Sequence, residues 1–139
     1  MSQPRIVIDT NVVISAFRSK RGASALLMRL VGQSKFTVAV SVPLFLEYEE
    51  QLQRKTELSI AEIEIFLSTL YAQVEKHLVG ISLRPLLTDR DDDMLAELAV
   101  DAKCEFVVSY NKRDLKPVEQ LGIQVVTPKE FLQRIGEIV

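Results

Sequence analysis

The sequence predicts a three-layer α/β/α fold, in which helices cover both faces of a central, mainly parallel sheet of roughly four to five strands. Short runs rich in β-branched residues recur along the chain, and most of them are followed by a segment with helical periodicity. The connections between these segments are short. No linker, repeat or low-complexity tract interrupts residues 1–139, so we expect a single domain.

The strands are predicted from short apolar runs. Arg5 to Ile8 is β-branched and ends on an acid, Asp9, as a buried strand of a parallel sheet does. Three further clear runs cover residues 36–40, 105–109 and 122–126, and a weak one covers 79–83. Sites in parallel sheets gather at the C-terminal ends of the strands, so the residues that follow these runs are candidates for function.

Five helices are predicted from the spacing of apolar side chains and from capping residues. They cover residues 22–33, a segment that opens at Ser41 with Pro43 in its first turn, a long segment from Ser59 to about His77, a segment from Asp89 or Asp91 to about Lys103, and a segment that opens at Thr127. Ser59 and Thr127 each begin a capping box, in which a glutamate three residues later returns a hydrogen bond to the cap.

The composition excludes several classes of protein. Seventeen basic and nineteen acidic residues give a net charge of −2, which argues against a protein that coats nucleic acid. Cys104 is the one cysteine and His77 the one histidine, so neither a disulfide nor a zinc cluster can form within the chain, and Cys104 is expected to be buried. We find no membrane-spanning run and no signal peptide, and we therefore expect a cytoplasmic protein.

Acidic residues follow the first strand and occur in the second predicted helix. Asp9 stands at the end of its strand, where it either binds a ligand or caps the next helix. In the helix after residue 41, Leu44 and Tyr48 share an apolar face at ~100° per residue. Glu47 and Glu49 flank this face on opposite sides, and the period does not choose between them. Glu50 points away and is expected to be solvated.

The segment 89–93 holds four aspartates in five positions. Acids at a helix start are favoured by the helix dipole, but this number exceeds what capping requires. At ~100° per residue, Leu95 and Leu98 belong to the buried stripe, Asp92 borders it, and Asp93 lies nearly opposite. Asp92 is therefore the better candidate for a site. Asp93 is expected to point away from the cleft, so its replacement should have a comparatively mild effect on activity.

A fourth polar segment follows the third strand, where Asn111 and Asp114 either line the same cleft or form a turn. Carboxylates that converge in a cleft repel one another and need a cation. Oxygen ligands without histidine or cysteine favour Mg²⁺ or Mn²⁺. The sequence offers no Ser–His or Cys–His pair and no phosphate-binding glycine fingerprint.

These motifs, in this order, resemble those of the PIN-domain family. The four matching segments are residues 6–15, 46–52, 89–99 and 106–115. The resemblance covers nearly the whole chain. It aligns Glu47, rather than Glu49, with the second acid of the family, and it independently selects Asp92. The chain is most similar to the toxin components of toxin–antitoxin pairs.

The resemblance implies hydrolysis of RNA phosphodiester bonds by an endoribonuclease that uses Mg²⁺ or Mn²⁺. The implied catalytic residues are Asp9, Glu47, Asp92, Asn111 and Asp114, of which Asp9, Glu47 and Asp92 bind the metal. Many family members carry aspartate where this chain has Asn111. Because an amide supplies no negative charge, a second metal site there is weakened or is filled through Asp114.

The remaining polar residues near the strand ends have supporting roles in this hypothesis. Ser109 and Asn11 are expected to orient the metal ligands. Six cations after the first and third strands either guide the RNA backbone or are solvated loop charges: Arg18, Lys20, Arg21, Lys112, Arg113 and Lys116.

The resemblance also implies an antitoxin partner and a homodimer. Leu46 and Ile65 lie off the main apolar faces of their helices, so we expect these two helices to contribute to the dimer surface. Two other functions stay open. One is a catalytically inactive PIN-like module that binds RNA or protein. The other is an α/β phosphatase with an aspartate nucleophile, although Asp9-Thr10-Asn11 lacks the second aspartate common in such enzymes.

Overall fold

The computed structural model describes residues 3–139 and has a five-stranded sheet in the order β3-β2-β1-β4-β5, with every neighbouring pair parallel. The strands are β1 (Arg5–Ile8), β2 (Thr37–Val40), β3 (Glu75–Lys76), β4 (Phe106–Val108) and β5 (Gln124–Val126). The predicted α/β/α class and the mainly parallel sheet are confirmed.

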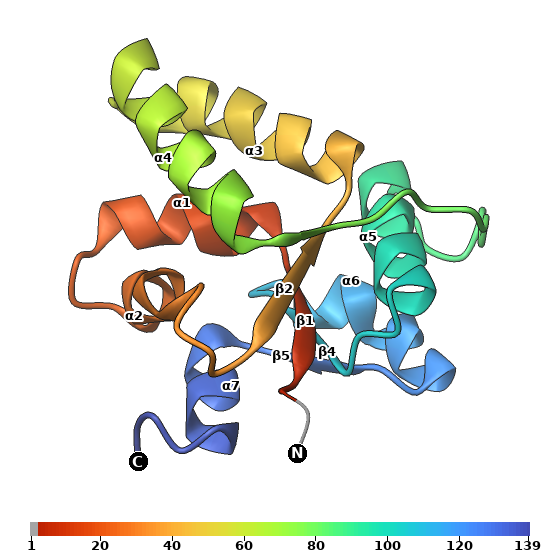
Figure 1. Ribbon diagram of the computed structural model, residues 1–139. Helices are drawn as coiled ribbons and strands as arrows, with labels where there is room; N and C mark the ends of the chain where they lie inside the picture. Colours follow the sequence, from red (N-terminus) through yellow and green to blue (C-terminus); the bar gives the residue numbers. More distant parts are fainter. Residues whose placement is uncertain (1–2) are drawn as a thin grey trace.

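Helices lie on both sides of this sheet (Figure 1). They are α1 (Thr10–Arg18), α2 (Ala23–Leu30), α3 (Val42–Lys55), α4 (Ile60–Gln73), α5 (Arg90–Asp101), α6 (Lys112–Leu115), the 3-10 helix η1 (Lys116–Leu121) and α7 (Pro128–Arg134). In Figure 1, α1, α2 and α7 lie on one side of the strands and α5 and α6 on the other. The helices α3 and α4 pack together near the ends of the strands.

Strand β1 is central and explains the β-branched runs of the sequence. Ile6, Val7 and Ile8 are almost completely buried, because helices cover both faces of the sheet. From β1 the chain builds outward through β2 and β3, and then returns to pair β4 with the other edge of β1. The boundary between β1 and β4 is therefore the switch point at which open α/β sheets bind ligands.

The capping residues predicted from the sequence are confirmed. Ser41 caps α3 by accepting a hydrogen bond from the Leu44 backbone N–H. Ser59 and Thr127 begin complete capping boxes at the starts of α4 and α7. These signals involve residues three apart in the chain, which is why the sequence alone locates them.

Two predicted elements were wrong. The long helix α4 ends at Gln73 rather than near His77, and the sheet edge is formed by β3 at Glu75–Lys76 instead of residues 79–83. Glu75 is held by an ion pair with Arg5 of the central strand, at 3.0 Å. A two-residue charged edge strand carries no β-branched pattern, so periodicity does not find it.

Helix α1 was not among the five helices predicted from the sequence. It follows β1 directly and is amphipathic, with buried apolar residues in its first half. Within residues 3–139, none of the helices is both long enough and apolar enough to cross a membrane.

Candidate metal-binding site

A pocket of about 460 Å³ opens at the C-terminal ends of β1 and β2, beside the switch point. Its walls are Asp9, Thr10, Asn11, Ile14, Arg18, Glu47, Gln51, Lys55, Asp89, Asp91, Asp92 and Asn111. Four of the five predicted site residues therefore lie around one space. The fifth, Asp114, is exposed on α6 and does not line the pocket.

Asp9 is fixed by three hydrogen bonds. Its Oδ1 accepts from the Thr10 backbone N–H at 2.8 Å, so Asp9 is also the cap of α1. Its Oδ2 accepts from Ser109 Oγ at 2.7 Å and from Asn11 Nδ2 at 3.3 Å. The two interpretations of Asp9 left open by the sequence are thus compatible, because one oxygen serves the helix while the residue lines the pocket.

Ser109 and Asn11 join the two strands at the switch point. Ile8 of β1 lies opposite Val108 of β4, which brings the following residues, Asp9 and Ser109, side by side. Ser109 is fully buried and its hydroxyl also accepts from the Asn111 backbone N–H at 2.9 Å. Asn11 Oδ1 accepts from the backbone N–H of the residue after Ser109, at 3.3 Å. Both side chains orient Asp9, as the sequence predicted.

Glu47 reaches the pocket from α3. Thr10 Oγ1 donates to Glu47 Oε2 at 2.8 Å, which links this acid to the start of α1. The neighbouring Tyr48 is fully buried and its hydroxyl donates to the backbone carbonyl of Ile8, so α3 is tied to the end of β1. This contact sets the rotation of α3 and turns Glu47 toward Asp9.

The structure also separates Glu47 from its acidic neighbours on α3. Glu49 lines a different pocket, between α3 and α4, and Glu50 forms an exposed ion pair with Arg54 at 3.4 Å. Of these three acids, Glu47 is the one that lines the pocket beside Asp9.

Asp92 enters the pocket from α5 and has no side-chain hydrogen bond to any residue between 3 and 139. The pKa of Asp92 is raised to about 6, first by burial and then by the negative charges of Asp9, Asp89, Asp114 and Asp91. Burial is also the main cause of the raised pKa of Asp9 and of Glu47. The pocket therefore holds partly desolvated carboxylates that lack a compensating positive charge at its acidic end.

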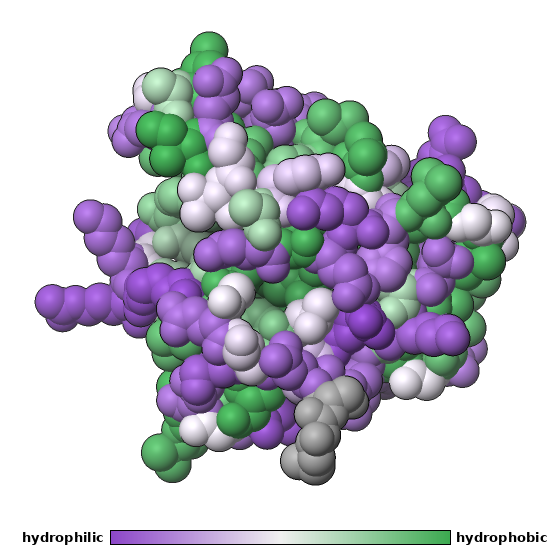
Figure 2. Space-filling model, in the orientation of Figure 1, coloured by the Kyte–Doolittle hydropathy of each residue, from purple (hydrophilic) through white to green (hydrophobic). Residues whose placement is uncertain are grey.

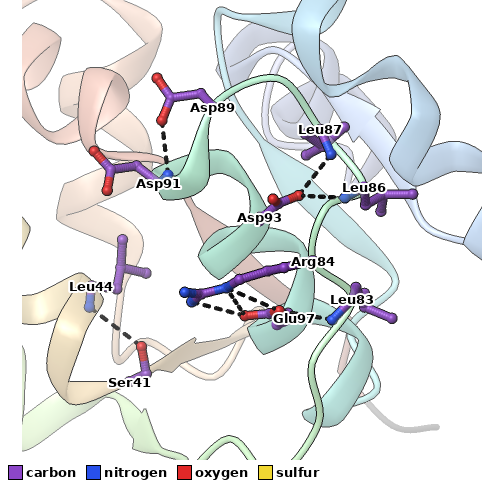
Figure 3. A network of polar contacts seen from close by, with 10 residues as sticks. All are labelled: Ser41, Leu44, Leu83, Arg84, Leu86, Leu87, Asp89, Asp91, Asp93 and Glu97. Carbon is purple, nitrogen blue, oxygen red and sulfur yellow. Dashed lines mark hydrogen bonds and ion pairs between the residues drawn. The ribbon is translucent and has the colours of Figure 1, made fainter.

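The opposite face of α5 carries two other acids. Asp93 points away from the pocket, as predicted, but it is buried although it lies opposite the apolar stripe of the helix. Asp93 is 2 % exposed and accepts from the backbone N–H groups of Leu86 and Leu87 at 3.2 and 2.7 Å (Figure 3). One turn later, Glu97 is 4 % exposed and accepts from Leu83 N at 2.8 Å. Helix α5 is buried on two faces, because the loop before it folds back along it.

The loop that folds back over α5 is also joined to it by an ion pair. Arg84 donates to Glu97 through two guanidinium nitrogens at 3.1 to 3.3 Å (Figure 3). The loop then leads into Asp89, whose side chain caps α5 by accepting from the Asp91 N–H at 2.8 Å. The cap is therefore Asp89, and the loop contacts fix the helix turn that carries Asp92.

The acids fit a hard divalent cation in chemistry, since all their donors are oxygens and their pKa values are raised by burial and by one another. Among the described residues, however, no three acidic, histidine or cysteine side chains are gathered closely enough to hold an ion as they stand. Asp9, Glu47 and Asp92 are the residues that would hold it, with their positions adjusted or with water as further ligands.

The structure sorts the six cations named from the sequence. Only Arg18 lines the pocket. Lys112 forms an ion pair with Glu130 at 2.8 Å, and Arg113 and Lys116 line a different surface hollow. Sequence reasoning missed Gln51 and Lys55, which stand one and two turns after Glu47 on α3 and would have been found by following that helical spacing.

The sequence of residues 5–113 matches the family model of the PIN domain. The matched range is most of the chain and contains Asp9, Glu47, Asp92 and Asn111. The chain belongs to the PIN-domain family. PIN domains are in general nucleases that use divalent metal ions. No curated protein matches the chain by sequence.

The fold is also found among solved structures. The chain is similar to a chain in the crystal structure of VapBC2 from Rickettsia felis bound to a DNA fragment from their promoter, with a TM-score of 0.64 and 12 % sequence identity. The match covers 88 % of this chain and 98 % of the other chain. At this identity the likeness establishes the PIN-type fold.

Proposed function

We propose that residues 1–139 form a single-domain, metal-dependent endoribonuclease that hydrolyses RNA phosphodiester bonds. The observation that carries the proposal is the pocket at the switch point, whose walls include Asp9, Glu47 and Asp92 from three separate segments of the chain. Structural acids normally have hydrogen-bond or ionic partners, but Asp92 has none among the described residues and its pKa is raised to about 6.

In this proposal each residue has a defined task. Asp9 and Asp92 bind Mg²⁺ or Mn²⁺, and Glu47 completes the ligand set, directly or through water. Ser109 and Asn11 keep the Asp9 carboxylate in a fixed orientation. A bound divalent ion supplies polarisation of a phosphate oxygen and activation of the attacking water. Asn111 lines the same pocket and offers an uncharged amide, whereas Asp114 acts only at longer range through its charge.

The deciding experiment is metal-dependent cleavage of single-stranded RNA by the purified protein, with a crystal soaked in Mn²⁺ to locate the ion. We expect cleavage with Mg²⁺ or Mn²⁺, none in EDTA, and metal density among Asp9, Glu47 and Asp92. Binding of RNA without cleavage under any metal would favour an inactive binding module, an alternative supported by Asn111 in place of an acid.

We further propose that the nuclease is the toxin of a toxin–antitoxin pair and acts in the cytoplasm, where its RNA substrate is present. The solved structure with a similar fold is described as VapBC2 bound to promoter DNA, which supports a protein partner for this chain as well. Co-expression with the protein encoded beside it should relieve growth arrest if this assignment is right. Growth arrest that no neighbouring gene product relieves would contradict it.

A homodimer through α3 and α4 is the assembly that we propose. Apolar side chains reach the surface over these helices among polar ones (Figure 2). Leu46 and Ile65, which the sequence predicted to lie off the core faces, are 57 % and 69 % exposed. Light scattering at micromolar concentration is expected to give a dimer mass, and Leu46→Glu with Ile65→Glu should reduce it to a monomer. A monomer mass for the wild type would remove the proposal.

A further inference from the structure

Two helices form parallel walls on one side of the acidic pocket. A single residue separates β1 from α1, and a single residue separates β2 from α3. The two strands are parallel neighbours. The helices therefore leave the same edge of the sheet, and they pack against each other (Figure 1). The acidic pocket begins at the first turn of α1 and at the second turn of α3, and the later turns extend away from it.

Side chains reach the pocket from successive turns of both helices. On α1 they are Asn11, Ile14 and Arg18, and on α3 they are Glu47, Gln51 and Lys55. The spacing of three or four residues keeps each series on one face of its helix. Both series begin at the acidic end and finish on a cation, about 10 to 12 Å farther along the helix axis.

The two terminal cations differ from their neighbours in the chain. Neither Arg18 nor Lys55 forms an ion pair with any acid of residues 3–139, whereas Arg54, beside Lys55, pairs with Glu50 at 3.4 Å. Between the acidic and basic ends, the Gln51 side-chain oxygen is buried and has no hydrogen-bond partner. A buried polar atom left without a partner is unusual in a native protein and marks a place where a ligand can supply one.

We propose that Arg18 and Lys55 form a phosphate subsite that binds the RNA strand roughly one to two nucleotides from the bond that is cut, with Gln51 contacting the nucleotide between. The inference rests on the proposed ribonuclease function. An RNA strand is repelled by the acids at the other end of the cleft, so attraction at this end is needed to hold it. The subsite makes the enzyme selective for oligonucleotides over a dinucleotide.

Binding in EDTA tests the subsite without any cleavage. The full chain is titrated into fluorescently labelled single-stranded RNA at several salt concentrations. Arg18→Gln and Lys55→Gln are each expected to weaken binding about five-fold at 0.1 M salt, and to reduce the slope of log K against log salt by ~0.7, the value for one phosphate contact of a single strand. The matched controls are Arg21→Gln and Arg54→Gln, whose side chains do not line the pocket and should leave both quantities unchanged.

The proposal is overturned if wild type and both variants have the same RNA affinity and the same salt dependence. It is also overturned if the control variants weaken RNA binding as much, which would show only a general effect of surface charge. Circular dichroism melting verifies that each variant is folded. If one single variant does not fold, the other still decides the outcome, because the two cations lie on different helices.

Cleavage kinetics separate the subsite from the proposed function. With Mg²⁺ or Mn²⁺, wild type should show a higher kcat/KM for a longer oligonucleotide than for a dinucleotide. The two variants should raise KM for the longer substrate, keep kcat, and cleave the dinucleotide as wild type does. If wild type cleaves no RNA, the ribonuclease function fails, while the binding measurement still decides the subsite. If it cleaves both lengths equally well, the subsite is wrong and the function stands.

Discussion

The two faces of α5 show what burial does to a carboxylate with and without hydrogen-bond donors. Asp93 and Glu97 are more deeply buried than Asp92, yet they accept hydrogen bonds from backbone N–H groups or from Arg84. Asp92 has no such donor within residues 3–139 and faces other acids, and its pKa is raised to about 6. Two adjacent aspartates in one helical turn are therefore expected to have opposite effects on stability. Asp93 is expected to stabilise the fold, whereas Asp92, with its raised pKa, is expected to lower stability when it is charged.

The largest expected effect comes from replacing the acids of the pocket. Asp9→Asn or Asp92→Asn should lower metal-dependent RNA cleavage by at least about 100-fold, because each removes a charge that holds the ion. Both variants should keep a native circular dichroism spectrum, since asparagine has the size of aspartate and the amide oxygen at position 9 can still accept from the Thr10 backbone N–H. The measurement is initial rate against Mn²⁺ concentration, and wild-type activity in both variants would show that the site is assigned wrongly.

The buried acids on the other face of α5 are tested through the free energy of unfolding. Asp93→Ala leaves the backbone N–H groups of Leu86 and Leu87 without a partner in a buried place, which should cost about 2–4 kcal/mol of unfolding free energy in urea titrations. The control is Asp91→Ala, whose exposed side chain makes no such contact. A change below about 0.5 kcal/mol for Asp93→Ala would show that the loop is not held by this residue.

The pH dependence of stability sharpens the contrast. The folded pKa of Asp92, about 6, lies above its ordinary value of 3.8, so the unfolded chain releases this proton first as pH rises. Asp92 therefore lowers stability across the window from about pH 4 to 6, and the loss is complete above that window. Without metal, Asp92→Asn should melt about 3 °C above wild type at pH 7, whereas at pH 4 the two proteins should have the same melting temperature. Solvent screening of this partly exposed group limits the gain at pH 7.

Adding Mn²⁺ at pH 7 should reduce or reverse this difference in melting temperature, because wild type gains free energy by binding the ion and the variant gains less. Differential scanning calorimetry measures both conditions. An identical metal-induced rise in melting temperature for the two proteins would exclude Asp92 as a ligand.

The smallest effect is expected at Asp89. This residue has a structural role, because it caps α5, and it also lines the acidic pocket. Asp89→Asn keeps a good capping residue, so stability should change by no more than about 0.5 kcal/mol. The variant removes one of the negative charges that raise the pKa of Asp92, and that pKa should fall toward its ordinary value. An NMR titration of the Asp92 carboxyl measures it, and an unchanged pKa would show that Asp89 is too far away to act.

Features that depend on near neighbours in the chain were predictable. The capping boxes at Ser59 and Thr127 and the buried strand β1 each show a local pattern that the structure reproduces. Asp92 was selected over Asp93 because it borders the apolar stripe of its helix. Asp92 does line the pocket and Asp93 does not, whereas the burial of Asp93 was not foreseen.

Features that depend on distant segments were not predictable from periodicity. The burial of Asp93 requires the loop of residues 83–88 to fold back over α5. The spacing of apolar residues in the sequence does not predict the path of this loop. Strand β3 exists because Glu75–Lys76 pairs with β2, not because those residues favour a strand.

The bond between Ser109 and Asp9 spans one hundred positions of the chain. A ribosome releases the N-terminal part first, so Asp9 emerges long before the hydroxyl that orients it. Strand β4 has to leave the exit tunnel and pair with β1 before the switch point exists at all. The acidic pocket is therefore incomplete during most of the synthesis of the chain, and it forms only when nearly all of the polypeptide is free to fold.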